Sequence, residues 1–213
     1  MKRSYLFSDS VEEYSPESSS MINREDNKLY VDQKDRTGYP WKEISLEEEE
    51  IIRVRQREFA YLNQDIREKL GVAAIEINDI FTCMGVGIIR ENAEIALAHL
   101  DGYKPQQLEY FLEKTEKRLQ GEVEESILVG LEETERFNRC YDILSSRFGK
   151  EKAIKILGQY NLDANENISL GADSDGFYLP KNTENKRKGR EGPPADKSEL
   201  IDIIEIRSEK TEM

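Results

Sequence analysis

The chain has 213 residues, of which 37% are hydrophobic and 35% are charged, and its formal net charge is −13. This length suits one moderate domain with tails, and the high charged fraction indicates that polar segments dilute the hydrophobic core. The negative charge repels nucleic-acid phosphates and anionic membrane surfaces, so it argues against both as partners and favours a basic protein partner.

The sequence predicts neither a signal peptide nor a membrane span. The N-terminus lacks an apolar stretch, and the most apolar segment, Val72–Ile89, contains Glu76, Asn78 and Asp79. Those polar groups would have to enter hydrocarbon together, at high cost. We therefore expect a soluble protein of the cytoplasm, or of the nucleus in a eukaryotic source, that does not act at a membrane.

Clusters of serine and acidic residues fill the first part of the chain without a helical or strand period. We interpret residues 1–44 as an N-terminal arm that is mostly disordered. Within it, Lys28–Asp32 is interpreted as a short strand or an extended docking segment. Trp41, the single tryptophan, is expected to anchor the arm against the domain, because an exposed indole would lose substantial burial.

The expected helical domain covers residues 45–161 and begins with a capping box at Ser45. Acidic side chains in the first turn complement the helix dipole there; they are Glu47, Glu48, Glu49 and Glu50. Apolar residues then follow at helical spacing, namely Ile52, Phe59, Leu62, Ile66 and Leu70. Gly71 is expected to end this helix.

The most apolar part of the chain, Val72–Leu100, is expected to form two helices, over residues 73–84 and 88–100. Gly85 and Gly87 between them indicate either a helix break or a point of close packing. This part contains more apolar residues than a single small bundle needs, so homo-oligomerisation is also considered.

Three further helices are expected, over residues 105–120, 122–148 and 150–160. Pro105 suits the first turn of the first of them, whose stripe is Leu108, Phe111, Leu112, Thr115 and Leu119. Apolar residues at spacings of three and four define the second, with the stripe Val123, Ile127, Leu131, Thr134, Phe137, Tyr141, Leu144 and Phe148. The fold class predicted is therefore mainly α, a compact bundle of five or six helices with coiled-coil contacts.

Residues 162–213 are interpreted as a flexible polar tail with a short apolar segment at 200–206. The apolar segment is expected either to dock on a partner or to fold back on its own domain; its candidate partner-binding residues are Ile201, Ile203, Ile204 and Ile206. A candidate basic patch, formed by Lys186, Arg187, Lys188 and Arg190, offers the one route to nuclear targeting or phosphate contact.

The sequence contains no recognisable catalytic, cofactor or metal-binding motif, and we expect none of the three sites. Cys83 and Cys140 are interpreted as free buried thiols, and His99 as a buried structural histidine. Residues 163–174 superficially resemble a calcium loop, but Ile168 replaces its glycine and Ser174 its bidentate glutamate. A Cys–His nucleophile pair stays open, because such residues meet only in space.

These observations favour a non-catalytic regulatory or accessory protein that binds a basic or helical protein partner. The acidic helical surface and the flexible tails are its expected contacts. One alternative is a nucleic-acid-associated regulator or an acidic mimic of DNA. A second alternative is a small enzyme with a site near Cys83, His99 or Cys140.

Overall fold

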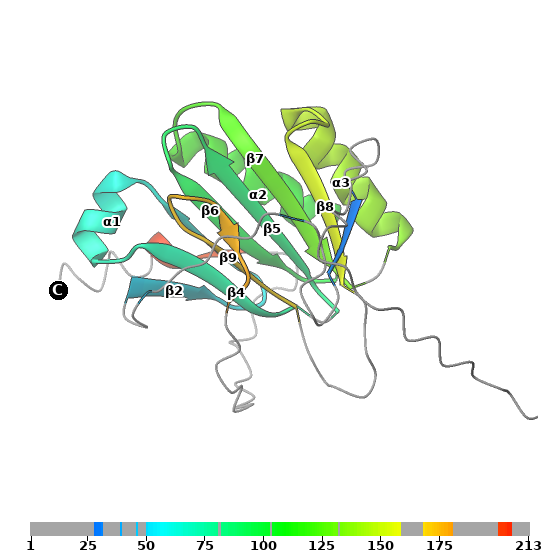
Figure 1. Cartoon of the computed structure of the whole chain (residues 1–213), viewed down its shortest axis with the longest axis horizontal. Coiled ribbons are helices and arrows are strands. Elements are labelled where there is room, and N and C mark those ends of the chain that lie inside the picture. The colour runs from blue at the N-terminus through cyan, green and yellow to red at the C-terminus, as the bar shows by residue number, and fades with distance from the viewer. Residues whose placement is uncertain are drawn as a thin grey trace, which may run out of the picture.

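The computed structural model describes residues 28–31, 39, 46, 50–80, 82–102, 104–131, 133–158, 168–180 and 200–205. Within these residues the chain forms three helices and eleven strands in three layers (Figure 1). A seven-stranded sheet lies in the middle, with two helices on one face and a four-stranded sheet on the other. The described helices include no segment that is both long and apolar enough to cross a membrane.

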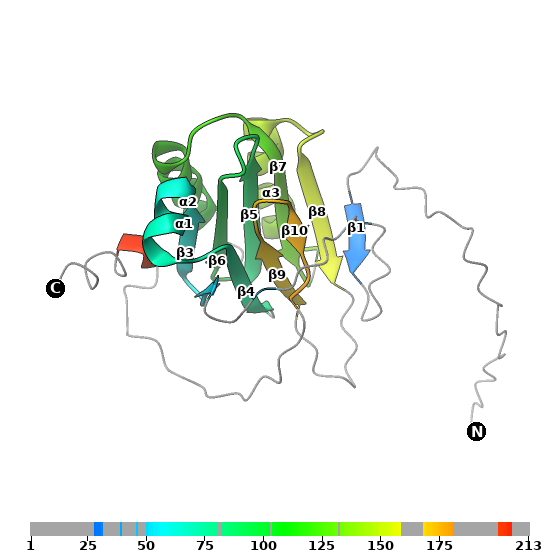
Figure 2. The same cartoon turned by 60° about the vertical axis from the view of Figure 1, so that its left-hand side comes forward.

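The seven-stranded sheet has the order β1-β8-β7-β5-β6-β3-β11. Its strands are β1 (Lys28–Val31), β3 (Glu58–Leu62), β5 (Met84–Arg90), β6 (Ile95–Leu100), β7 (Val123–Gly130), β8 (Ala153–Gly158) and β11 (Ile201–Asp202). The central pairs are antiparallel, whereas β1, β8 and β7 run parallel to one another and β11 runs parallel to β3. Figure 2 shows β1 and β11 on opposite sides of the sheet.

The four-stranded sheet has the order β10-β9-β4-β2. It consists of β2 (Ile51–Val54), β4 (Ala74–Ile80), β9 (Ile168–Ala172) and β10 (Phe177–Tyr178). The two sheets pack closely where β5 carries glycine. A Cβ built on Gly87 would lie 2.3 Å from Cε1 of Phe177, and one on Gly85 would lie 2.6 Å from Cδ1 of Ile80.

Helices α2 (Pro105–Arg118) and α3 (Glu135–Phe148) cover the other face of the seven-stranded sheet. The ring of Phe59 in β3 meets that of Phe111 in α2 edge to face, with centroids 5.9 Å apart. Because β7 and β8 are parallel, the chain needs a crossover between them, and α3 supplies it. The short helix α1 (Gln64–Leu70) lies at the periphery and buries no residue completely.

The prediction of a mainly α bundle with coiled-coil contacts is wrong, because the described residues form a mixed α/β fold rich in sheet. Residues 73–84 and 88–100, expected as helices, form β4, β5 and β6. Every residue of β5 and β6 is buried. A strand covered on both faces reads as an unbroken apolar run, which periodicity cannot distinguish from a buried helix. The close-packing interpretation of Gly85 and Gly87 is confirmed.

The helix expected from Ser45 to Leu70 is helical only in its last part. Residues 51–62 form β2 and β3, and α1 begins at Gln64 after the N-cap Asn63, whose side chain accepts a hydrogen bond from the N–H of Ile66. Gly71 ends α1 as predicted, with a left-handed φ of 65°.

The helix expected over 105–120 is confirmed as α2, with Pro105 in its first turn. The expected helix over 122–148 is wrong in its first part, which is β7, and correct in its second part, which is α3. The expected helix over 150–160 is wrong, because residues 153–158 form β8. Of the two interpretations of Lys28–Asp32, the structure contains the strand, β1.

Strands β9, β10 and β11 come from the region beyond residue 161 that was expected to be a flexible tail. Leu200, Ile203 and Ile204 are buried, and Ile201 pairs with Glu58 of β3. The apolar segment therefore folds back on the chain, which is one of its two predicted arrangements. The boundaries at residues 44 and 161 stay predictions, although strands from beyond 161 complete both sheets.

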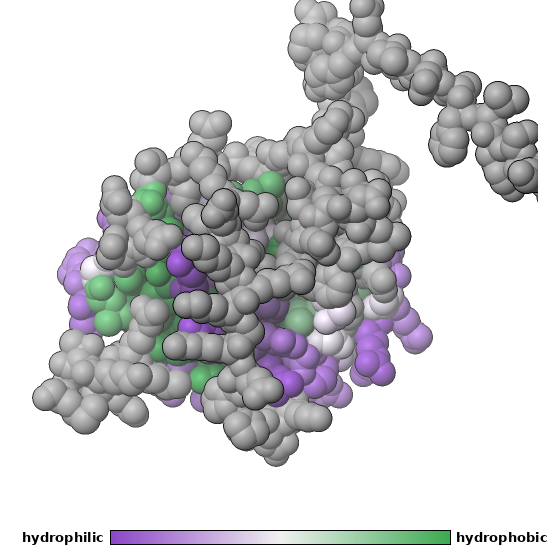
Figure 3. Space-filling view, turned by 90° about the horizontal axis from the view of Figure 1, so that it is seen from below, coloured by the Kyte–Doolittle hydropathy of each residue, from purple (hydrophilic) through white to green (hydrophobic). Residues whose placement is uncertain are grey.

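Hydropathy varies across the described surface. In the view from below in Figure 3, most of the visible hydrophobic side chains lie on the left, with hydrophilic side chains beside them and further hydrophilic side chains below the centre and on the right. Among the described residues, Tyr110 of α2 is a large hydrophobic residue that is exposed, with 39% of its surface accessible.

Candidate thiol site at the start of β5

Cys83 immediately precedes β5 and is 5% exposed. Burial raises the pKa of the Cys83 thiol, and this effect outweighs the lowering by the backbone of Gly102, by the side chain of Thr82 and by the charge of Arg57. Thr82 is itself exposed. The resting sulfur is therefore a protonated thiol.

His99 lies on the neighbouring strand β6, opposite Gly85 of β5, and is 4% exposed. Extending this register by one pair would place Cys83 opposite Asp101, whose charge acts on the thiol. Cys83 and His99 would then be diagonal neighbours, a relation for which residues are typically about 7–8 Å apart. The register thus places on adjoining parts of the sheet a cysteine and a histidine that are 16 positions apart in the sequence.

A cluster of polar side chains lies beside Cys83 and is centred on Asp101. The Asp101 carboxylate accepts hydrogen bonds from Gln56 Nε2 at 2.8 Å, from Arg57 Nε at 3.1 Å and from Lys104 Nζ at 3.0 Å. The pKa of Asp101 is lowered: burial acts to raise it, but the bonds from Lys104 and Gln56 and the two positive charges outweigh that effect. A turn before β3, the end of β6 and the start of α2 supply these groups.

Cys140 provides a contrast within the same chain. It lies in α3 with no exposed surface, and burial raises the pKa of its thiol to about 12. Both cysteines are free and buried, as predicted. The pKa of Cys83, however, is lowered by Gly102 and Thr82, whereas only the charge of Arg139 lowers that of Cys140, so the two buried thiols differ in chemical environment.

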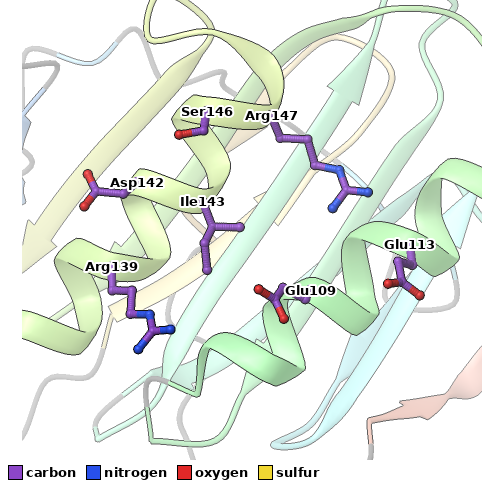
Figure 4. A pocket seen from close by; sticks show the side chains of 7 residues that line it. All are labelled: Glu109, Glu113, Arg139, Asp142, Ile143, Ser146 and Arg147. Carbon is purple, nitrogen blue, oxygen red and sulfur yellow. The ribbon is translucent and has the colours of Figure 1, made fainter.

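A second feature is a shallow groove of about 530 Å³ between α2 and α3 (Figure 4). Helix α2 contributes two glutamates, and α3 contributes Ile143 together with charged and hydroxyl side chains; the lining residues are Glu109, Glu113, Arg139, Asp142, Ile143, Ser146 and Arg147. Arg147 binds Glu116 of α2 through two hydrogen bonds, of 2.6 and 2.7 Å. This pairing joins the helices along one rim of the groove.

Several predicted site residues lie outside the described residues, namely Trp41, Glu47, Glu48, Glu49, Ile206, Lys186, Arg187, Lys188 and Arg190. Among the described ones, Glu50 directly precedes β2. Glu124 and Glu125 lie in β7, so they do not share a helical face with Glu135 of α3. These three glutamates are therefore divided between a strand and the start of a helix.

The end of the segment that resembles a calcium loop lies within the described residues, in the turn after β9. Oδ1 of Asp173 accepts hydrogen bonds from the N–H of Asp175 at 2.8 Å and from that of Gly176 at 3.1 Å. The carboxylate closes the turn between β9 and β10. In the described part of the chain, no three histidine, cysteine or acidic side chains are grouped so that they could hold a metal ion.

The sequence left open a pair of His99 with either cysteine, and it gave no indication of the cluster around Asp101. The expected helix over residues 88–100 stops just before Asp101. An alternation of apolar residues across Met84–Leu100 would have indicated a hairpin, but complete burial on both faces removes that alternation.

Comparison with known proteins adds no assignment to this geometry: no protein-family model matches the chain, and no similar sequence is found among curated proteins.

Proposed function

We propose that this chain is a thiol-dependent enzyme that hydrolyses or transfers an acyl group, with Cys83 as the nucleophile and His99 as its base. The observation that carries the proposal is the strand register, which places Cys83 just before β5 and His99 on the neighbouring strand β6, opposite Gly85. This proposal takes up the enzyme alternative of the sequence analysis, since the bundle on which the scaffold interpretation depended is not the fold.

The chemistry follows from the pair. His99 accepts the thiol proton while the Cys83 sulfur attacks the carbonyl carbon of an amide or ester, and a C–S bond forms. The bond to the leaving nitrogen or oxygen then breaks, and that atom takes the proton from the imidazolium. Water hydrolyses the resulting thioester, which returns the thiol and releases the acid. A raised thiol pKa at rest suits this route, because the base removes the proton only during attack.

The test uses the full chain and p-nitrophenyl acetate as an acyl donor. We expect acetylation of Cys83, detected by mass spectrometry of the intact protein and its peptides, to exceed that of Cys140 by about tenfold or more, because the proposed base, His99, lies on the strand next to Cys83. Cys83→Ser should abolish acetylation, whereas Cys140→Ser, the matched control, should leave its rate unchanged. Acetylation that persists in Cys83→Ser would overturn the proposal.

His99 needs a separate readout, because its replacement inside the sheet also affects folding. We expect His99→Gln to slow acetylation of Cys83 and to make the rate follow the titration of the thiol alone, at higher pH. Circular dichroism melting of the same variant monitors the fold. An unchanged pH profile in a folded His99→Gln variant would remove His99 from the mechanism.

The groove between α2 and α3 favours a second candidate function, binding of a basic protein partner. Three carboxylates, of Glu109, Glu113 and Asp142, line the groove around Ile143, which offers an apolar contact. Arg139 adds a positive charge to the lining of the groove, and Arg147 is already paired with Glu116. A regulatory or accessory role through protein contact, the function first expected from the sequence, would use this surface in place of an acidic helical face.

The second candidate is tested with a basic amphipathic peptide in a fluorescence anisotropy titration. Binding is expected to weaken in Glu109→Gln/Glu113→Gln and in rising salt, because exposed charges are screened. Glu68→Gln on α1 is the control, because it also replaces a glutamate by glutamine but at a position that does not line the groove. Equal affinity in both variants would exclude the groove.

A further inference from the structure

The surroundings of Cys83 differ in charge from the chain as a whole. Two cations, Arg57 and Lys104, face the single carboxylate of Asp101 in the described part of the site. The whole chain, which includes this cluster, has a formal net charge of −13. A locally positive rim in an acidic protein attracts an anion to that place while the rest of the surface repels it.

The cations are held in position. Arg57 Nε and Lys104 Nζ both meet Oδ2 of Asp101, at 3.1 and 3.0 Å, and Gln56 binds the other carboxylate oxygen. The backbone of Arg57 is fixed as well, since its N–H donates to the carbonyl of His99 at 2.8 Å and its carbonyl accepts from Ile201. Arg57 therefore connects the strand that carries His99 with β11.

The side chains of Arg57 and Lys104 remain 26% and 38% exposed. Their charged ends are thus partly open to solvent while their orientation is restricted. Guanidinium and ammonium groups fixed in this way bind a carboxylate or phosphate through charge-assisted hydrogen bonds.

From this cluster we infer that the thiol site selects substrates with an anionic group next to the reacting acyl carbon, and that Arg57 and Lys104 bind that group. This inference rests on the proposed function, because the selected group is presented to Cys83. Asp101 acts as a positioning residue that holds both cations and reduces their combined charge.

The experiment compares two alkylating reagents of similar size on the full chain, anionic iodoacetate and neutral iodoacetamide. The measured quantity is the ratio of their rates at Cys83, divided by the same ratio for 2-mercaptoethanol. We expect this normalised ratio to be above one in native protein at low salt, by about tenfold, and to fall as salt screens the rim. Peptide mass spectrometry assigns the modification to Cys83.

Lys104→Gln should lower the normalised ratio, and Asp101→Asn should raise it, since the first removes a cation and the second an anion. Lys114→Gln is the matched control: it makes the same change on α2, about 15 Å further along the helix axis. It should leave the ratio unchanged.

The outcomes separate the two proposals. A normalised ratio of one or less, insensitive to Lys104→Gln, would overturn the anion selectivity and leave the thiol proposal standing. A Cys83 that reacts with neither reagent in the folded protein would overturn both.

Discussion

Gly87 shows how a single position fixes the distance between the two sheets. A Cβ at this residue would lie 2.3 Å from Cε1 of Phe177 and 2.8 Å from side-chain carbons of Ile127 and Leu97. These neighbours are buried and belong to three different strands. None of them can move without disturbing its own packing, so the position tolerates only glycine.

We therefore expect Gly87→Ala to destabilise the protein by about 1–3 kcal/mol, the typical cost of overpacking a core. Chemical denaturation followed by circular dichroism measures the loss. Adding Phe177→Leu should recover part of it, because the larger ring is the nearest obstacle; purely additive effects would contradict this explanation.

At the same scale, the sequence predicted that both cysteines are buried and free, since each lies among apolar residues. It could not distinguish the two. The groups that lower the pKa of Cys83 include Thr82 beside it and Gly102, which is 19 positions away in the sequence. The pairing of β5 with β6 brings the part of the chain that contains Gly102 towards Cys83.

The spacing of apolar residues along one element explains why the sequence predicts a helix where the structure contains a strand. In the expected helix over 122–148, the first stripe residues, Val123, Ile127 and Leu131, are spaced by four. A spacing of four keeps one face in a helix, and it also keeps one face in a strand, where the period is two. The odd step of three, which a strand does not allow, first occurs between Leu131 and Thr134, beyond the end of β7 at Gly130. The structure places the N-cap of α3 at Thr134.

The C-terminal element, Leu200–Glu205, is attached through a buried acid. Oδ1 of Asp202 accepts the N–H groups of Ile204 and Glu205, whereas its Oδ2 is buried without a hydrogen-bond partner among the described residues. Tyr61, Arg118 and Glu205 are the titratable groups around it. Burial raises the pKa of Asp202, and the charge of Glu205 adds to this effect. The hydrogen bonds from the N–H groups of Glu205 and Ile204 and the charge of Arg118 lower the pKa by less.

This raised pKa gives a pH dependence with a definite sign. A carboxyl whose folded pKa exceeds its unfolded value contributes stability at low pH and loses it as pH rises through the folded pKa. We expect Asp202→Asn to raise the melting temperature near pH 7 and to lose that advantage towards pH 4. Thermal melts at both values measure the difference.

Asp101→Asn is the matched comparison, because the pKa of Asp101 is lowered. Its contribution to stability is present above the unfolded pKa and disappears in acid. Asp101→Asn should therefore lower the melting temperature near pH 7, with the difference vanishing as the pH falls. Two variants that shift in the same direction near pH 7 would contradict this account of the charges.

For the whole molecule, composition and charge indicated a folded middle with polar flanks, but the architecture depends on segments from those flanks. Strand β9 lies between β10 and β4, and it pairs with Ile75, Glu76 and Ile77. Its own residues, Ile168–Ala172, follow an Asn- and Asp-rich stretch and include a glycine. No local pattern marks such a strand, because its stability comes from pairing with β4.

A fragment of residues 45–161 was expected from the sequence to be an independent helical domain. The structure leads to a different prediction, since this fragment lacks β1, β9, β10 and β11. With β10 it loses Phe177, which packs against Gly87 of β5. We expect it to unfold with low cooperativity and to bind a hydrophobic dye, while the full chain shows a mixed α/β circular dichroism spectrum. A fragment as stable as the full chain would contradict the role of β9.

Strands β1 and β11 close the two lateral borders of the seven-stranded sheet, and both lie far in the sequence from the strands beside them. Proteolytic cleavage between β1 and the rest of the chain, or before β11, would allow the outermost strand to leave the sheet. The strand beside it would then expose a row of unpaired backbone amides to other molecules. We expect the cleaved protein to form a fibrous precipitate on storage. The segments that contain β1 and β11 would then protect the protein from aggregation as well as complete its fold.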